Sequence, residues 1–298
     1  MPLRVTQGMI QNQMIRNLNR NFERMSGLEN QLSTGRKINK PSDDPVGITY
    51  ALRYRSELSM NDQYQRNITE ATSSVSHLDI VLDQVNDLIK RIKELAIRGI
   101  SDSSPDSARS AIGQELEGIY QQLFSLGNDQ MNGKYIFNGQ KTTTAPYDFD
   151  TAASQDTDDS DILLPVAPGV EIATNITGSK VFGASTDADN LFRVINEIKQ
   201  GMLDNDPDRA KDVMDALDTR LDTFLGVRAE VGARANRIEM LDNRNQIMND
   251  ILNGLSGKTE DADIDKTIMN LKRDENVYLA SLSTAARLIQ PSLVDYLR

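Results

Sequence analysis

The feature that most constrains this chain is a regularly spaced series of apolar residues between positions 68 and 96. Its members lie alternately three and four residues apart: Ile68, Ala71, Val75, Leu78, Leu82, Val85, Ile89, Ile92 and Ala96. A mean step of about 3.5 residues keeps all of them on one narrow line of an α-helix, which is the pattern of a coiled-coil seam. Asp44 and Pro45 are a suitable helix start, and Gly99 a suitable end.

The same signals predict more helix in both halves of the chain. A second helix is expected between 104 and 127, and another long seam between 207 and 255. This second seam has two polar members, Arg228 and Asn245. Glycine disfavours a helix interior, so Gly254 and Gly257 predict a break before the last segment.

Both ends of the chain carry the same spacing in shorter form. The N-terminal arm has Gln11, Met14, Leu18, Asn21, Met25, Leu28 and Leu32, and the C-terminal segment has Ile264, Ile268, Leu271, Glu275, Tyr278, Leu282, Ala285 and Ile289. Helices of this length have too little core of their own to be stable alone. Either they pack on the body of the protein, or they become ordered when neighbouring subunits complete the seam.

Residues 131–190 have a different texture, with Asn-Gly turn pairs, scattered Pro and Gly, and short apolar runs. The fold class predicted is therefore mainly α with a β insert: an elongated helical coiled-coil bundle formed by both chain ends, carrying a small β-rich outer domain. The expected divisions are a terminal arm (1–42), two halves of a helical body (43–139 and 191–257), the insert (140–190) and a terminal helix (258–298).

Composition argues against most catalytic chemistry. The chain has no Cys and one His, which removes disulfides, Cys- or His-based zinc sites and most catalytic triads. His77 lies beside a seam position and is expected to be a surface residue. The acidic run 156–161 fails the EF-hand pattern at both its Gly and its Glu position. We expect no enzyme, no metal and no cofactor.

Charge and hydropathy also limit the partners. The net charge of −11 disfavours nucleic acid, and no apolar stretch is long enough to insert in a membrane. The first residues lack the apolar region of a cleaved signal peptide. Composition alone would therefore suggest a cytosolic protein.

Two motifs point to a family. Residues 33–47 read STGRKINKPSDDPVG, and residues 278–297 read YLASLSTAARLIQPSLVDYL. Both ends resemble flagellins and their relatives. The form KPSDDPVG, with Pro41 and Pro45, and the ending at 290–297 resemble the hook–filament junction proteins (flagellar hook-associated protein 3). The resemblance covers about 1–140 and 190–298.

The resemblance implies a flagellin-like structural protein of the bacterial flagellum, exported by the flagellar type III route without a cleaved signal peptide and located outside the cell. It would form the layer between hook and filament on which flagellin polymerisation starts. The implied partners are another hook-associated protein on the hook side, flagellin on the filament side, further copies of the chain in a ring, and an export chaperone.

Within that family the terminal seams would pair as an antiparallel coiled coil only in the assembled stack. The residues expected to face one another are Met14, Leu18, Met25, Leu28 and Leu32 in the arm, and Tyr278, Leu282, Ala285 and Ile289 in the last helix. Asp43, Asp44 and Pro45 are expected to cap the next helix and stabilise the loop that joins arm and body. A simple helix cap without any partner contact is an equally good interpretation.

Two other functions stay open. The chain could be a flagellin that polymerises into filaments, although Pro41, Pro45 and the Gln290-Pro291-Ser292 ending favour the junction proteins. It could also be a coiled-coil adaptor with a ligand-binding β domain.

Overall fold

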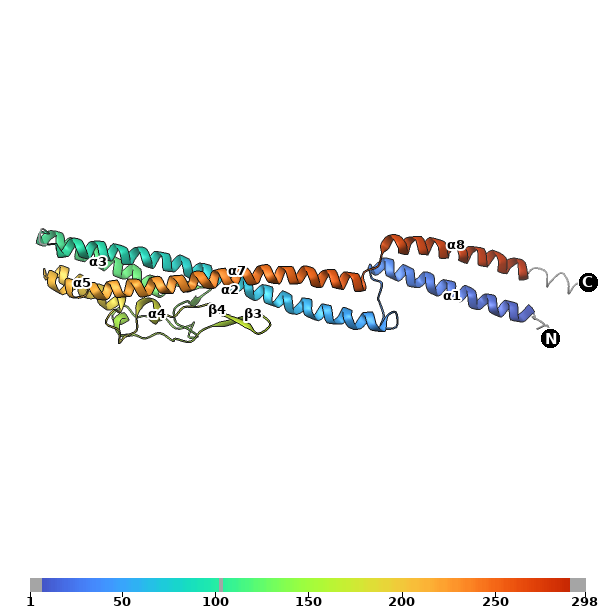
Figure 1. Cartoon of the computed structure of the whole chain (residues 1–298), viewed down its shortest axis with the longest axis horizontal. Coiled ribbons are helices and arrows are strands. Elements are labelled where there is room, and N and C mark those ends of the chain that lie inside the picture. The colour runs from blue at the N-terminus through green and yellow to red at the C-terminus, as the bar shows by residue number, and fades with distance from the viewer. Residues whose placement is uncertain (1–6, 102–103, 290–298) are drawn as a thin grey trace, which may run out of the picture. The chain divides into compact units, whose positions relative to one another are not determined.

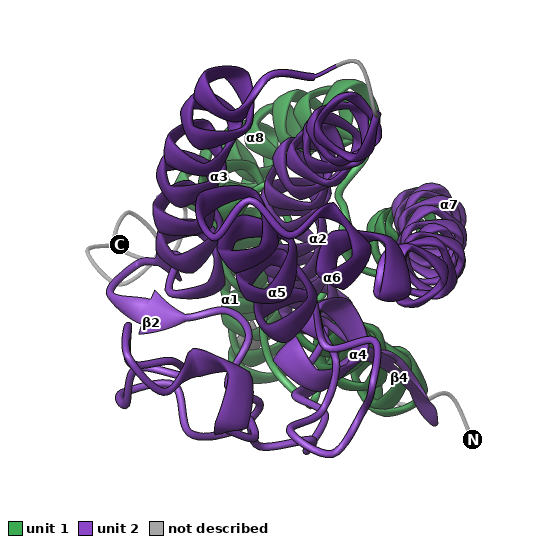
Figure 2. Ribbon diagram, turned by 90° about the vertical axis from the view of Figure 1, so that its left-hand side faces the viewer, with its two compact units in different colours: residues 1–60, 248–298 green, residues 61–247 purple. Residues whose placement is uncertain are grey.

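Two long helices, α2 (Pro45–Ile100) and α7 (Met214–Glu260), organise the fold. The computed structural model describes residues 7–101 and 104–289 (Figure 1). The chain divides into two compact units, one of residues 1–60 with 248–298 and one of residues 61–247 (Figure 2). Both divisions fall inside α2 and α7, so each long helix contributes to both units.

The first unit adds the terminal helices α1 (Gln7–Thr34) and α8 (Ile264–Ile289) to the outer parts of α2 and α7. Its helix starts are marked by aspartates. Asp44 precedes α2, and Asp263 precedes α8, where its Oδ1 accepts a hydrogen bond from the backbone N–H of Lys266 at 3.1 Å. Such side-chain caps satisfy N–H groups that have no partner within the helix.

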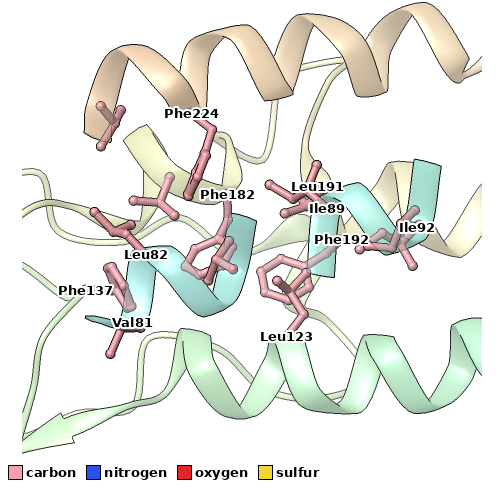
Figure 3. Close-up of a cluster of buried hydrophobic side chains, with 14 of the residues drawn as sticks. Val81, Leu82, Ile89, Ile92, Leu123, Phe137, Phe182, Leu191, Phe192 and Phe224 are labelled. Carbon is pink, nitrogen blue, oxygen red and sulfur yellow. The ribbon is translucent and has the colours of Figure 1, made fainter. Parts of the chain in front are cut away.

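In the second unit α2 and α7 run antiparallel, as the bond from Lys93 Nζ to Asp218 Oδ1 and the opposite contact of Asn61 with Asn245 show. Every seventh residue of α7 is buried: Leu217, Phe224, Val231, Ile238, Asn245 and Leu252, the last of which belongs to the first unit. Every residue of the predicted seam between 68 and 96 is buried as well. The core is completed by α3 (Asp106–Gly127), α5 (Leu191–Leu203) and α6 (Pro207–Asp212). Figure 3 shows a part of this core, where Leu123 of α3 and Phe192 of α5 lie near Ile89 of α2.

The segment between the helical halves forms two short antiparallel hairpins, β1 (Gln130–Met131) with β2 (Lys134–Tyr135), and β3 (Leu163–Ala167) with β4 (Val170–Ala173). A 3-10 turn (Ala152–Ser154) and the short helix α4 (Gly178–Phe182) complete it. Much of the rest is irregular chain held by side-chain hydrogen bonds.

This segment packs on the helices of the second unit. Phe137 and Phe182 meet edge to face at 5.3 Å, and Phe182 stacks on Phe192 of α5 at 5.2 Å. Arg234 of α7 donates to the carbonyl oxygens of Ala173 and Asn175. The insert and the helices therefore share one hydrophobic core.

The predicted fold class, mainly α with a small β part, is confirmed. The expected break at Gly254 and Gly257 is wrong, because α7 continues through both to Glu260. Two helical glycines cost about 1 kcal/mol each, which the buried Leu252 and the buried, ion-paired Glu260 can offset.

Candidate assembly surface

The terminal helices α1 and α8 lie side by side and run in opposite directions (Figure 1). The rings of Phe22 and Tyr278 are 6.5 Å apart, and Nε of Arg24 lies 3.4 Å from Oδ2 of Asp274. These two contacts define the antiparallel register of the pair.

The apolar seam residues predicted on α1 are all half-buried, whereas the polar seam member Gln11 is exposed: Met14, Leu18, Met25, Leu28 and Leu32 form the half-buried set. On α8, Tyr278 is half-buried and Ala285 is buried, whereas Leu282 is 41% exposed. The side chain of Ile289 lies outside the described residues. The seam is thus only partly covered by a single copy of the two helices.

The register also extends the seam toward the start of α8. It places Leu28 and Leu32 opposite the first turns of α8, where Thr267 is buried and Leu271 is half-buried. In the first half of α8 the spacing predicted Ile264 and Ile268 as seam residues, but both are exposed and Thr267 is buried instead, so the predicted seam is wrong there and Thr267 was missed. Thr267 is polar, so a prediction from the spacing of apolar residues cannot detect it.

A polar cluster interrupts this seam. Asn21 and Asp274 are both buried, and the guanidinium of Arg24 connects them: Nη2 donates to Asn21 Oδ1 at 2.5 Å and Nε faces the Asp274 carboxylate. Arg273 adds a second, longer contact to Asp274 at 3.6 Å. A buried polar group at a seam position favours one register, because any slip leaves it without partners.

Large apolar side chains remain exposed on the same two helices. The most open on α1 is Phe22, at 61% exposure, and on α8 it is Met269. Others are Met9, Ile10, Ile15, Ile264, Ile268, Val277 and Leu279. Near the free end of the pair, a groove of about 740 Å³ opens between α1 and α8, lined in part by Met9, Met14, Val277 and Ala280. A surface this apolar indicates contact with other proteins.

The connection between α1 and α2 is built by the two aspartates of the signature. Asp44 Oδ1 accepts from the backbone N–H groups of Val46 at 3.1 Å and Gly47 at 2.9 Å, which is N-cap geometry, and Pro45 takes the first helical position. Because Pro45 has no backbone N–H group, no donor is left without a partner at the first position of α2.

Asp43 folds the loop in front of that cap. Its Oδ2 accepts from the backbone N–H groups of Lys40 at 2.8 Å and Asn39 at 3.0 Å. These hydrogen bonds, that from Lys40 first, hold the pKa of the Asp43 carboxyl below its ordinary value. The buried side chain of Ile38 lies close to Gly47. A Cβ added at Gly47 would lie 2.6 Å from Cδ1 of Ile38.

A second contact ties this connection to the one between α7 and α8. Buried Glu260 accepts from Nε and Nη2 of Arg55, and its Oε2 lies 3.8 Å from Nε of Arg36. The Arg55 hydrogen bonds raise the pKa of that guanidinium. The backbones are joined as well, since Lys37 N–H donates to Glu260 O at 2.6 Å and Ala262 N–H to Gly35 O at 2.9 Å. Both loops are thereby held together where α1 ends and α8 begins.

Sequence reasoning missed this clasp of Arg36, Arg55 and Glu260. Arg55 and Glu260 are 205 positions apart, and neither lies in a motif that singles it out. The only available signal was the position of Arg36 directly after the Ser-Thr-Gly of the signature.

The histidine and the carboxylates considered for catalysis or metal binding can be placed in the structure. His77 Nε2 lies 2.7 Å from Asp129 Oδ2, a half-buried pair that joins α2 to the end of α3. Among the described residues, no group of three or more His, Asp or Glu side chains is arranged to hold a metal ion. None of the helices within residues 7–101 and 104–289 is both long and apolar enough to cross a membrane.

Known proteins agree with this arrangement. The N-terminal helical region of bacterial flagellin, as a sequence family, matches residues 5–142. Flagellar hook-associated protein 3 of Escherichia coli K12 is 30% identical over 233 residues, which cover 71% of this chain and 74% of that protein. The protein of the same name from Salmonella typhimurium is 30% identical over 251 residues, covering 74% and 79%. Flagellins are also similar, at lower identity.

A solved structure described as a flagellar hook-associated protein, from Vibrio parahaemolyticus, has the same fold. It covers 74% of this chain and 100% of its own, with a TM-score of 0.68 and 24% sequence identity. The paired terminal helices and the flagellin-type N-terminal region define a flagellin-like structural protein of the bacterial flagellum. The chain belongs to the flagellar hook-associated protein 3 family.

Proposed function

We propose that this protein forms the junction layer between hook and filament and that α1 and α8 carry its assembly. The observation that supports this most is the incomplete burial of their seam. Five apolar seam residues of α1 are only half-buried, and further apolar side chains are exposed on both helices. Fully burying an exposed side chain of this size contributes about 1.5–3 kcal/mol, and covering the part still exposed here contributes a corresponding fraction, which other subunits of the stack would supply.

The partners follow from that position. Further copies of the chain would complete a ring, another hook-associated protein would lie on the hook side, and flagellin on the filament side. The protein would reach this place outside the cell through the flagellar type III route, escorted by an export chaperone and without losing a signal peptide. Its family membership supports these partners.

The two connecting loops would couple the positions of α1 and α8 to each other. Asp43, Asp44 and Pro45 shape the loop after α1, and Glu260 holds that loop to the one before α8. We propose that this arrangement makes α1 and α8 move as one element when neighbouring subunits bind. The alternative role of Asp44 as a helix cap alone predicts that loop variants lower stability without affecting assembly.

Gene deletion tests the proposal directly. Cells without the gene should make complete hooks but no filaments, and flagellin should accumulate in the medium, as seen by electron microscopy and an immunoblot of the culture fluid. Loss of the major filament protein itself would instead identify a flagellin. Normal filaments would contradict the proposed function and direct attention to the insert as a ligand-binding domain.

A single substitution tests the seam. Leu282 is 41% exposed in one copy, so Leu282→Asp should leave folding and export unchanged but abolish filament formation, because a carboxylate would be buried between subunits. Asn276→Asp adds the same charge at an exposed position of α8 and should restore filaments in the deletion strain. If Leu282→Asp also restores them, this seam is not the assembly surface.

A further inference from the structure

We infer that Asn132 is a site of spontaneous deamidation, a chemical modification of the turn between β1 and β2. This inference is independent of the proposed function. The chain contains three Asn-Gly pairs, at 132–133, 138–139 and 253–254. Asn-Gly is the dipeptide most prone to this reaction, because glycine has no side chain to obstruct attack by its own backbone nitrogen. The three pairs lie in very different surroundings.

Asn132 and Gly133 are the two residues of a tight hairpin turn. Both have positive φ, 53° and 75°, which is the conformation of a type I′ turn. Both are exposed, and a Cβ on Gly133 would meet nothing within 4 Å. Among the hydrogen bonds of the described residues, none involves the Asn132 side chain. The flanking strands have two residues each, and one further backbone hydrogen bond, from Ile136 N–H to Asp129 O at 3.2 Å, extends their pairing. A two-stranded hairpin of this length contributes little stability of its own.

Asn138, only six positions further on, is held in place. Its Nδ2 donates to Thr144 O at 3.0 Å and its Oδ1 accepts from Asp158 N–H at 3.0 Å. The residue is buried, and Gly139 is packed so tightly that a Cβ would lie 2.3 Å from the Asp158 carbonyl oxygen. The carboxamide therefore cannot turn toward the Gly139 nitrogen.

Asn253 is protected in another way. It lies within α7, where the helical backbone keeps the next N–H in the hydrogen-bond ladder and points it away from the side chain. Its own amide contacts Asn249 Oδ1. Of the three pairs, only 132–133 has a free carboxamide next to a backbone that can rotate.

The reaction proceeds in two steps. The deprotonated backbone nitrogen of Gly133 attacks Cγ of Asn132, the new N–Cγ bond forms, the Cγ–Nδ2 bond breaks, and ammonia leaves. Water then adds to either carbonyl of the cyclic imide and opens it, giving aspartate or isoaspartate. Both products add a negative charge to the turn. Isoaspartate also lengthens the backbone by a methylene, which is incompatible with the pairing of Met131 and Lys134.

Peptide mapping tests this inference on the full chain. The folded protein is incubated in mildly alkaline buffer, and trypsin then separates the three pairs into peptides 110–134, 135–141 and 245–258. Fragment ions should place the first amide-to-acid change, with its isoaspartate, at Asn132, while Asn138 and Asn253 stay intact. In concentrated urea the three pairs should react at similar rates, because the structure that protects two of them is gone.

Equal reaction of the three pairs in the folded protein, or earlier reaction of Asn138, would overturn the inference. A variant provides a second test. Gly133→Ala places a methyl group beside the attacking nitrogen and should suppress the product at Asn132, with circular dichroism to verify that the fold is kept. An unchanged rate in Gly133→Ala would show that this nitrogen is not the nucleophile.

Discussion

Asn61 and Asn245 donate their side-chain amides to each other's backbone carbonyl oxygens across the seam between α2 and α7, at 3.2 and 3.3 Å. Asn245 Nδ2 also donates to Gln65 Oε1 at 2.7 Å. Both asparagines are buried at positions where the seam otherwise carries apolar residues. A reciprocal pair of this kind can form in only one register, so it aligns the two longest helices.

Replacing one member of this pair should cost more than replacing both. Asn61→Ala removes the side-chain hydrogen bond to the Asn245 carbonyl oxygen and leaves a gap in a buried layer beside the polar Asn245, and is expected to lower the free energy of unfolding by about 1–3 kcal/mol in urea titrations. The double variant Asn61→Leu/Asn245→Leu should recover much of that loss through apolar packing but broaden the amide resonances of the seam, as alternative registers become populated. A double variant with sharp resonances would show that the apolar heptads alone align the helices.

Tyr147 offers the opposite case, a buried polar group that makes no bond. Its hydroxyl has no protein hydrogen-bond partner among the described residues, and the ring packs 4.9 Å from that of Phe192. Removing the hydroxyl by Tyr147→Phe should therefore leave stability unchanged or raise it by about 1 kcal/mol. Tyr120→Phe is the matched control, because the Tyr120 hydroxyl donates to Phe149 O at 3.3 Å and its loss should be destabilising.

The same residue predicts how stability depends on alkaline pH. Burial raises the pKa of Tyr147 well above its ordinary value. The folded protein then holds this proton more tightly than the unfolded chain, so its stability is complete below the unfolded pKa of about 10 and falls as pH rises above it. Unfolding monitored by tyrosinate absorbance should be less steep with pH in Tyr147→Phe than in the wild type. Identical slopes would mean that this hydroxyl ionises in the folded protein.

Gly47 is expected to tolerate no side chain. A Cβ there would lie 2.5 Å from Asp44 Oδ2 and 2.6 Å from Ile38 Cδ1, so Gly47→Ala should disturb both the helix cap and the packing of the loop. Gly118 is also helical but has open space around it, and Gly118→Ala should stabilise by about 0.5–1 kcal/mol. Thermal unfolding of both variants should therefore shift in opposite directions. Faster tryptic cleavage after Lys37, whose next residue is Ile38, would locate the damage of Gly47→Ala in the loop.

Much of the helical architecture was predictable because it depends on local spacing. The series from 68 to 96 requires one face of a helix to be buried, whatever covers it, and the structure buries all of it. Helix starts at Pro45 and Pro207 follow from local chemistry in the same way. The end of α7 was not predictable from Gly254 and Gly257, because tertiary contacts around Glu260 outweigh the low helix propensity of glycine.

The candidate assembly surface was predictable only in its apolar half. Spacing identifies residues such as Met14 and Leu28 on α1, but not Asp274 or Thr267, which are buried on α8. The clasp on Glu260 depends on two arginines that are far away in the sequence. A charged residue at the end of a helix is normally expected to be exposed to solvent. Polar contacts of this kind can be identified only when the register of the two helices is known.

The Arg24–Asp274 pair should therefore decide how α1 and α8 align. Asp274→Arg places a cation at a buried position next to the exposed Arg24 and is expected to prevent filament formation in a deletion strain, since a desolvated charge loses its partner and repulsion acts where Nε and Oδ2 are now 3.4 Å apart. Arg24→Asp combined with Asp274→Arg restores opposite charges and should recover part of the filaments. Arg20→Asp, at an exposed position of α1, is the control for charge alone.

Because the chain has no cysteine, Phe22→Cys with Tyr278→Cys can report the register of α1 and α8 by cross-linking. The cross-link should form in the wild-type background, be lost with Asp274→Arg and return in the charge swap; formation in all three would show that the apolar seam sets the alignment without the ion pair.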